Sequence, residues 1–211
     1  MEDIILIDKP KGITSFDVIR RLRKGLGKKK MGHAGTLDPL ASGLMIIGVG
    51  EGTKKLSEYI KLPKSYIAEI LVGEKRSTGD MEGEVVEKKE VKGLEKTEVE
   101  KVLKEMVGVL HLKVPIYSAV KVGGKRLYKE VRKGREVSAP TRDMEIKNNQ
   151  LLDIRKEGDY VVVEAQFDVE SGVYIRSLAE EFGKRLGYPA TVKELRRTQI
   201  GDFKIEDAEK I

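Results

Sequence analysis

Residues 32–49 read Gly32-His33-Ala34-Gly35-Thr36-Leu37-Asp38-Pro39-Leu40-Ala41-Ser42-Gly43-Leu44-Met45-Ile46-Ile47-Gly48-Val49. The first part is a loop rich in glycine and proline that contains one acid, Asp38, and the apolar run from Leu44 to Val49 predicts a buried strand. A rigid loop in front of a core strand is a common way to present a reactive side chain. Taken alone, however, an aspartate before a proline is more often a turn residue than a catalytic one.

The composition limits the classes of protein that need to be considered. The chain has 211 residues, 39% of them hydrophobic, which is enough for a sizeable core, and a formal net charge of +6. That modest positive charge suits a polyanionic partner, although solubility alone also explains it. There is no cysteine and there are two histidines, so we expect no disulfide and no zinc site. The N-terminal residues are too acidic for a signal peptide and no apolar run reaches membrane-spanning length, so we expect a cytoplasmic protein.

Hydrophobic periodicity predicts strands interspersed with helices along the chain. Strands are expected at residues 4–7, 44–49, 65–72, 84–87, 144–154, 160–169 and 195–203. Helices are expected after Ser15 as the N-cap, from Thr53, from Thr97, near 127–132 and through 178–186, with Gly187 as the C-cap. This mixture predicts an α+β protein with a mixed or antiparallel sheet. The length allows one large domain or two small ones.

A basic segment between Pro115 and Pro140 interrupts this pattern. Two tyrosines, Tyr117 and Tyr128, are interleaved with its cations, which are Lys121, Lys125, Arg126, Lys129, Arg132, Lys133 and Arg135, against the acids Glu130 and Glu136. Such a run is usually a solvated face. Its tyrosines and glycines also suit a mobile insertion that closes on a nucleic-acid backbone, and the cluster Lys28-Lys29-Lys30 before the Asp38 loop suits neighbouring phosphates.

Six motifs occur in the order found in the TruB family of pseudouridine synthases, and the chain resembles that family over nearly its entire length. The motifs are Lys9-Pro10 with Gly12 and Thr14-Ser15; the Gly32–Leu44 loop; Lys64-Ser65-Tyr66 followed by Thr78, Asp80 and Gly83; Pro115–Lys121 with Gly124 and Leu127-Tyr128; Gly172-Val173-Tyr174-Ile175-Arg176; and Leu195-Arg196-Arg197. The resemblance implies the pseudouridine synthase catalytic fold, with a mixed, mainly antiparallel central sheet flanked by helices. It also implies a single catalytic domain over residues 1–211, with a thumb-like insertion at about 115–140.

The resemblance also implies an activity, the isomerisation of a uridine in RNA without a metal or a cofactor. It implies catalytic roles for Asp38, Tyr66 and Arg176, with the Arg176 guanidinium keeping the Asp38 carboxylate ionised. It places His33 at the displaced nucleotide and Leu195 in the wall of the pocket. Further pocket or RNA contacts are expected at Gly32, Thr36, Tyr174, Lys9, Lys121, Lys125, Arg126, Tyr128 and Lys129.

The resemblance implies tRNA as the partner, bound through its T-arm stem-loop, with the uridine at position 55 as the target and a monomer as the working form. Bacterial members usually carry a C-terminal RNA-binding extension, often of the PUA type, and we expect no such module here because the sequence ends at Ile211, soon after Leu195-Arg196-Arg197. Two alternatives stay open. One is a guide- or partner-dependent pseudouridine synthase acting on rRNA or other RNA, and the other is a non-catalytic RNA-binding or tRNA-folding protein.

Overall fold

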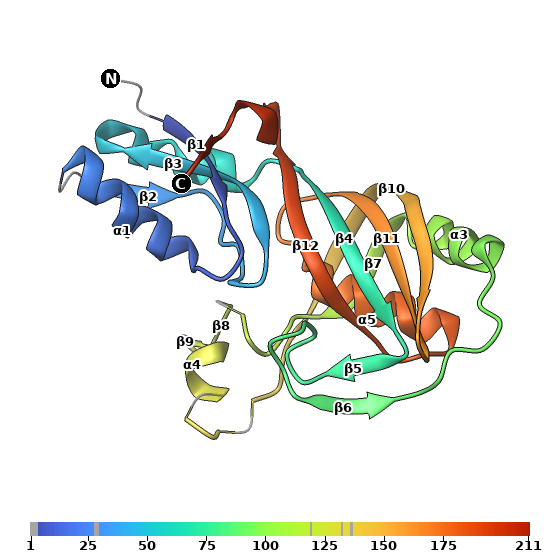
Figure 1. Ribbon diagram of the computed structural model, residues 1–211. Helices are drawn as coiled ribbons and strands as arrows, with labels where there is room; N and C mark the ends of the chain where they lie inside the picture. Colours follow the sequence, from blue (N-terminus) through green and yellow to red (C-terminus); the bar gives the residue numbers. More distant parts are fainter. Residues whose placement is uncertain (1–3, 28–29, 119, 132, 136) are drawn as a thin grey trace. The chain divides into compact units, whose positions relative to one another are not determined.

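The computed structural model describes residues 4–27, 30–118, 120–131, 133–135 and 137–211 (Figure 1). Its contacts divide the chain into two compact units. Unit 1 is Met1–Ile67, Asp168–Ser171 and Glu194–Ile211, and unit 2 is Ala68–Phe167 and Gly172–Lys193. Three strands, β4 (Lys64–Val72), β11 (Tyr160–Val169) and β12 (Ala190–Ile200), have residues in both units. The single catalytic domain over residues 1–211 stays a prediction.

Unit 1 is built on strands in the order β14-β1-β3-β12, with β2 beside β3 and β13 beside β12. The added strands are β1 (Ile4–Lys9), β2 (Met31–His33), β3 (Ser42–Val49), β13 (Phe203–Lys204) and β14 (Glu209–Lys210). β3 is antiparallel to β1 and β2 and parallel to β12. Its centre is fully buried, and Leu44 and Ile46 pack there with Ala34, Leu56 and Ile200.

The helical segments of unit 1 are α1 (Ser15–Leu26), α2 (Leu56–Ile60) and the 3-10 turns η1 (Gly50–Lys54) and η2 (Ile205–Asp207). The prediction that Ser15 caps α1 is wrong by one residue, because Thr14 is the N-cap. The Thr14 hydroxyl accepts from the Asp17 backbone N–H at 3.1 Å, and the Asp17 carboxylate accepts from the Thr14 backbone N–H at 2.9 Å. This reciprocal capping box leaves the Ser15 hydroxyl available for another partner.

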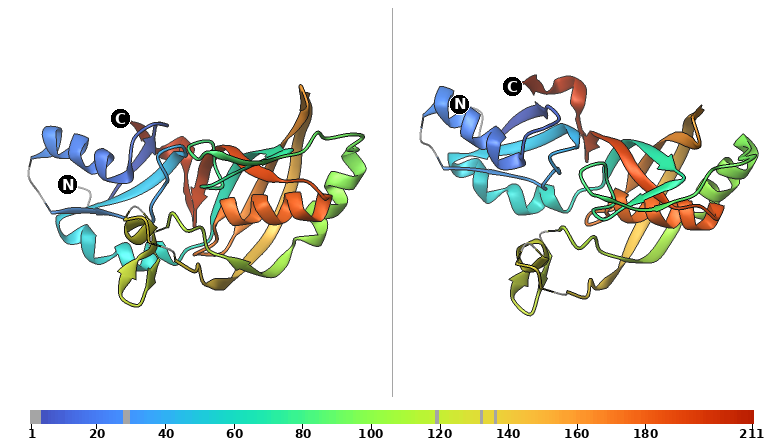
Figure 2. Two further views of the ribbon diagram at one scale, coloured as in Figure 1. Left: turned by 90° about the horizontal axis from the view of Figure 1, so that it is seen from below. Right: turned by 60° about the horizontal axis from the view of Figure 1, so that its bottom comes forward.

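Unit 2 contains the strand order β4-β11-β10-β7, with β10 (Thr141–Glu157) antiparallel to β7 (Gly108–Lys113). A separate antiparallel hairpin consists of β5 (Glu74–Arg76) and β6 (Val85–Lys88). Helix α3 (Lys96–Glu105) packs on β10 and on α5 (Ile175–Leu186), which packs on β7 (Figure 2). Gly187 ends α5 in the left-handed conformation with φ +77°, which confirms the predicted C-cap.

The basic insertion forms a small element within unit 2 (Figure 2). It contains the hairpin β8 (Lys121–Val122) and β9 (Lys125–Arg126), followed by α4 (Leu127–Val131), where the short helix was predicted. The Val114 N–H donates to the Pro140 carbonyl at 2.9 Å and closes its base. Val120 and Leu127 are buried against Val114 and Met144, so the insertion has its own apolar anchor.

The predicted α+β class with a mixed central sheet is confirmed. Parallel pairs, β1 with β14 and β3 with β12, occur beside antiparallel pairs such as β1 with β3 and β7 with β10. Among the described residues, no helix is long and apolar enough to cross a membrane.

Candidate active site

Asp38 lies in the loop between β2 and β3 of unit 1, and its side chain is half-buried. Its carbonyl accepts from the Ala41 N–H at 3.1 Å, which folds the loop back on itself immediately after the acid. Leu37, Leu40 and Ala41 are buried. The loop is therefore attached to the core by apolar side chains on both sides of Asp38.

Ser15, at the start of α1, fixes the residue immediately before Asp38. Its hydroxyl donates to the Leu37 carbonyl at 2.9 Å and accepts from the Leu37 N–H at 2.8 Å. A single buried hydroxyl thus satisfies both backbone polar groups of Leu37, which would be costly to leave unpaired in the core. The sequence prediction gave Ser15 a capping role and missed this contact, because the two residues are far apart in the chain.

The turn after β1 fixes the residue immediately after Asp38. The Gly12 N–H donates to the Pro39 carbonyl at 2.8 Å, and the Lys9 ammonium lies 3.5 Å from the same oxygen. Lys9 is fully buried and also donates to the Ile13 carbonyl at 2.8 Å. Lys9 is thus placed beside the predicted catalytic acid as part of the structure that supports the loop.

Arg197, on β12, joins the two ends of the Asp38 loop. Its side chain is only 1% exposed, its Nε donates to the Leu44 carbonyl at 2.8 Å, and its Nη2 donates to the Gly35 carbonyl at 3.3 Å. The sequence pattern included Arg197 in a motif but assigned it no role. An arginine within a strand is usually exposed, so only the paired carbonyls reveal its function as a brace.

The electrostatics behind the loop are dominated by buried cations. Burial, together with the positive charge of Arg197, lowers the pKa of Lys64 to about 8. The Lys64 ammonium donates to the Ile60 carbonyl at 2.9 Å. Burial also lowers the pKa of His33, with a smaller contribution from Arg197, so its imidazole is neutral at pH 7. A cationic surrounding of this kind favours an ionised carboxylate or an anionic ligand at the loop.

The other site residues predicted in unit 1 fall on its strands and on the loop. Tyr66 is buried on β4, and Leu195 is half-buried on β12. Gly32 lies on β2, where a Cβ atom would come within 2.8 Å of the Leu56 side chain. Thr36 is exposed on the loop itself.

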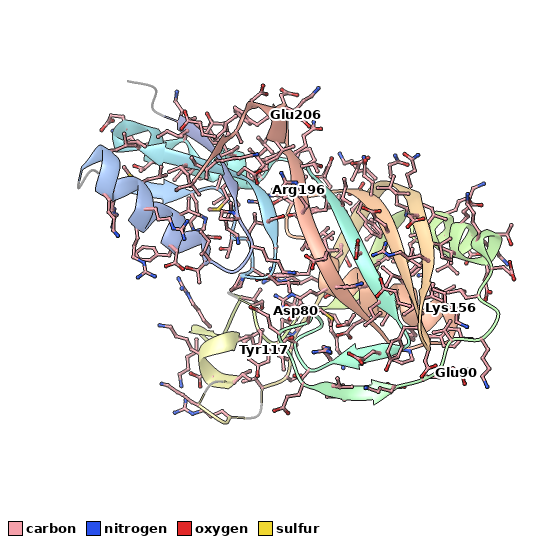
Figure 3. The ribbon with its side chains drawn as sticks, viewed as in Figure 1. Asp80, Glu90, Tyr117, Lys156, Arg196 and Glu206 are labelled. Atoms are coloured by element: carbon pink, nitrogen blue, oxygen red, sulfur yellow. The ribbon has the colours of Figure 1, made fainter. Side chains whose placement is uncertain are left out.

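Arg176, in the first turn of α5, is the centre of the site residues in unit 2. It is 6% exposed, and its Nη1 and Nη2 donate to the carbonyls of Thr78 at 3.0 Å and Tyr117 at 3.1 Å. Nη1 also lies 3.7 Å from the Asp80 carboxylate. Figure 3 labels Asp80 and Tyr117 on the two segments that the guanidinium connects. Tyr174 is the N-cap residue of α5 and packs on the apolar anchor of the insertion.

The predicted RNA contacts of the insertion are described in part. Lys125, Arg126 and Lys129 are exposed. Glu130 forms an ion pair with Arg135, and that hydrogen bond lowers the pKa of Glu130. The side chains of Lys121 and Tyr128 lie outside the described part of the chain, as do the residues at 28, 29, 119, 132 and 136.

The predicted residues are therefore divided between the units. Asp38, His33, Lys9, Tyr66 and Leu195 belong to unit 1, whereas Arg176, Tyr174 and the insertion belong to unit 2. The pairing of Asp38 with Arg176 stays a prediction. Unit 1 by itself contains the Asp38 carboxylate on a loop that is held at the residue before it, Leu37, and the residue after it, Pro39. This geometry suits nucleophilic or electrostatic catalysis.

The chain is similar in sequence to known RNA-modifying enzymes. A family model described as "TruB family pseudouridylate synthase (N terminal domain)" matches residues 23–175. The protein named tRNA pseudouridine synthase B from Fusobacterium nucleatum is 43% identical over 206 residues, covering 98% of this chain and 70% of that protein. The protein of the same name from Bacillus cereus is 42% identical, with 98% and 68% covered, and that from Corynebacterium diphtheriae is 37% identical, with 97% and 69% covered.

Solved structures of similar fold come from ribonucleoprotein complexes. One chain, from the "Structure of H/ACA RNP bound to a substrate RNA containing 2'-deoxyuridine", has a TM-score of 0.71 and 26% identity, with 98% of this chain and 50% of that chain covered. Another, from the "Crystal Structure of a Cbf5-Nop10-Gar1 Complex", has a TM-score of 0.73 and 29% identity, with 99% and 52% covered. The chain thus spans about half the length of these two structural relatives.

Proposed function

The chain belongs to the TruB family of pseudouridylate synthases, and from this premise we propose that it converts the uridine at position 55 of the tRNA T-loop to pseudouridine. The choice of tRNA rests on the names of relatives that are 37% to 43% identical over almost the whole chain. The choice of position 55 rests on the resemblance of the motifs. The structural observation that carries the proposal is the Asp38 loop, held by Ser15 at Leu37 and by Gly12 at Pro39.

The reaction is an isomerisation, so it needs a positioned carboxylate rather than a redox partner. The bond from N1 of the uracil to C1′ of the ribose breaks, the base turns, and C5 forms a new bond to C1′. The C5 proton leaves and N1 is protonated, so the atoms balance. Asp38 acts as the nucleophile or stabilises the oxocarbenium-like ribose, and its fixed loop keeps it in position during the rotation of the base.

The other site residues have roles that follow from their chemistry. Tyr66, buried on β4, lines the pocket against the uracil and is a candidate to help the C5 proton leave. Leu195 is an apolar wall of the same pocket. Arg176 keeps the Asp38 carboxylate ionised once the site is closed to water, because a guanidinium opposes the protonation that burial favours.

His33 supports the displacement of the target nucleotide from its stack. Extruding a base costs roughly a few kcal/mol, and a group that fills the vacated space lowers that cost. The lowered pKa of His33 keeps its ring neutral, which suits stacking on a neighbouring base. The exposed cations Lys125, Arg126 and Lys129 of the insertion hold the phosphates of the T-arm.

The test is incubation with unmodified tRNA, followed by mapping of pseudouridine at single-nucleotide resolution. Asp38→Asn removes the negative charge at nearly constant size, so product is lost while tRNA binding is largely kept. Asp202→Asn, an exposed turn aspartate of the same unit, is the matched control and keeps the activity. Product formed by Asp38→Asn would overturn the mechanism.

A second candidate is a synthase that needs a guide RNA or partner proteins. The similarity to chains from H/ACA and Cbf5-Nop10-Gar1 complexes favours it, at 26% and 29% identity. It predicts no product on bare tRNA at any enzyme concentration. A third outcome, tight binding of tRNA with no product from any RNA, would indicate a non-catalytic RNA-binding protein.

A further inference from the structure

We propose that the exposed face of helix α1 binds a single-stranded segment of RNA beside the target uridine. Phe16 and the guanidinium of Arg20 beside it stack on bases, and Arg21 and Lys24 hold phosphates. This inference rests on the proposed function, because it takes the occupant of the face to be the RNA substrate. It adds a contact surface in unit 1 to the predicted contacts of the insertion in unit 2.

The beginning of α1 is attached to the Asp38 loop. Ser15 holds both backbone polar groups of Leu37 through buried hydrogen bonds of 2.9 and 2.8 Å, and Asp38 is the next residue along the loop. Phe16 is the next residue along the helix. We therefore place the nucleotides that flank a uridine at Asp38 over the start of α1.

Phe16 and Arg20 form a stacking surface at this point. Phe16 is 54% exposed, and the centre of the Arg20 guanidinium lies 5.8 Å from the centroid of its ring. A single exposed phenylalanine is common on protein surfaces and needs no ligand to explain it. A phenylalanine that carries a guanidinium beside a catalytic loop offers two flat groups of the kind on which unpaired bases stack.

The charges along α1 are complementary to a phosphate backbone. Phe16, Arg20 and Lys24 are spaced four residues apart, so they share one side of the helix over about 12 Å. Arg20, Arg21 and Lys24 are exposed, whereas Val18 and Ile19 face the core. The helix has one acid, Asp17, whose carboxylate is already bonded to Thr14 and paired with Arg20. Arg20 is therefore neutralised within the helix, and the positive charge open to phosphates on this face comes from Arg21 and Lys24.

Binding of unmodified tRNA at several salt concentrations tests the charges. Arg21→Gln with Lys24→Gln removes two cations from the face and lowers the slope of log Kd against log salt by about 0.7 for each phosphate that no longer has a cationic partner. Lys204→Gln with Lys210→Gln, exposed positions on β13 and β14, makes the same change in net charge and leaves the slope unchanged. An equal slope in both double variants would overturn the charge assignment.

Two variants of Phe16 test the stacking. Phe16→Leu keeps an apolar side chain but removes the ring face, so we expect Kd to rise about five- to tenfold. Phe16→Tyr keeps the ring and the wild-type affinity. Because the side chain is exposed, thermal unfolding of both variants stays close to that of the wild type, which separates weaker stacking from impaired folding.

The two proposals fail in different ways. If the wild type makes pseudouridine and all α1 variants keep its Kd and salt slope, the proposal that α1 binds RNA is wrong. The exposed face of α1 would then be a candidate site for a protein partner. A wild-type protein that makes no pseudouridine on any RNA would overturn the proposed function whatever its affinity. Loss of affinity in Phe16→Leu that Phe16→Tyr restores supports the surface.

Discussion

At the scale of single residues, Arg176 depends on the shape of its side chain as well as on its charge. Its guanidinium donates in two directions, to Thr78 and to Tyr117, while facing the Asp80 carboxylate. A lysine keeps the positive charge but cannot reproduce this fork. We therefore expect Arg176→Lys to lower kcat/KM by about 10- to 100-fold.

Single-turnover measurement of pseudouridine formation checks this prediction. Arg185→Lys, on the same helix but paired with Glu181 near the surface, is the matched control and retains most of the activity. Near-wild-type turnover in Arg176→Lys would argue against the proposed pairing with Asp38.

Arg197 offers a second prediction at this scale, because it is buried between two carbonyls. Arg197→Met leaves the carbonyls of Gly35 and Leu44 without their donor and releases both ends of the Asp38 loop. We expect the free energy of unfolding to fall by about 2–4 kcal/mol. The measurement is urea unfolding followed by fluorescence of the tyrosines or by circular dichroism.

The neighbouring Arg196 supplies the comparison. It pairs with Asp8 at 2.7 Å, but its side chain is 41% exposed, so Arg196→Met costs about 1 kcal/mol or less. In Arg197→Lys the lysine can reach one carbonyl but not both, so we expect its loss of unfolding free energy to lie between those of Arg196→Met and Arg197→Met. Equal losses in Arg196→Met and Arg197→Met would contradict the bracing role.

At the scale of elements, the pairing of β3 with β12 explains why glycine occupies position 43, at the start of β3 just after the Asp38 loop. The two strands are parallel with Arg197 opposite Gly43, and a Cβ atom at Gly43 would lie 2.2 Å from the Arg197 carbonyl oxygen. Gly43 also has φ +111°, a conformation that other residues adopt with strain. The loop that carries Asp38 and the strand that carries Arg197 therefore fit together only with glycine at this position.

The insertion is the element whose charges we expect to act on RNA directly. Reversing Lys125, Arg126 and Lys129 to glutamate should weaken tRNA binding and flatten its dependence on salt, because fewer counterions are released when phosphates lose their partners. Lys96, Lys101 and Lys104, exposed on α3 of the same unit, provide a control with the same change of charge. A salt slope that is equal in the two triple variants would argue against the insertion as an RNA clamp.

At the scale of the whole molecule, the stability should depend on pH through Lys64. Burial lowers the pKa of Lys64 to about 8 in the folded state, whereas an unfolded lysine titrates near about 10.4. Between these values the unfolded chain binds more protons than the folded chain, so the free energy of unfolding rises with pH through this window. This rise in the free energy of unfolding is on the order of 1–3 kcal/mol over the whole window, and Lys64 causes no such rise below about pH 8.

Chemical unfolding at pH 7.5, 9 and 10 measures this effect. Because other groups titrate in the same range, the quantity to compare is the difference between the wild type and Lys64→Met at each pH. We expect Lys64→Met to remove part of the rise, whereas Lys61→Met, an exposed lysine nearby in the chain, preserves it. Parallel curves for the wild type and Lys64→Met would contradict the lowered pKa.

Several features were predictable from the sequence because they depend on local chemistry. The alternation of apolar and polar residues located the strand at 160–169, since side chains two residues apart share one face of a strand. The helical period located the helix that ends at Gly187, since side chains three or four residues apart share one face of a helix. The clustering of lysine and arginine located the insertion, and the ordered motifs indicated the family before any contact was known. Asp38 was identifiable as a candidate for the same reason, although its turn chemistry alone favoured a structural role.

Other features were decided only by the tertiary structure, because they join residues that are far apart in the chain. Ser15 was expected to cap α1, but Thr14 took that role and the Ser15 hydroxyl binds Leu37, 22 residues away. Arg197 had no role in the sequence pattern, yet it reaches Gly35 and Leu44 across more than 150 positions. By itself the sequence determined which acid the Asp38 loop presents. The tertiary structure decided how that loop is held, because buried backbone groups must find their partners wherever the fold brings them.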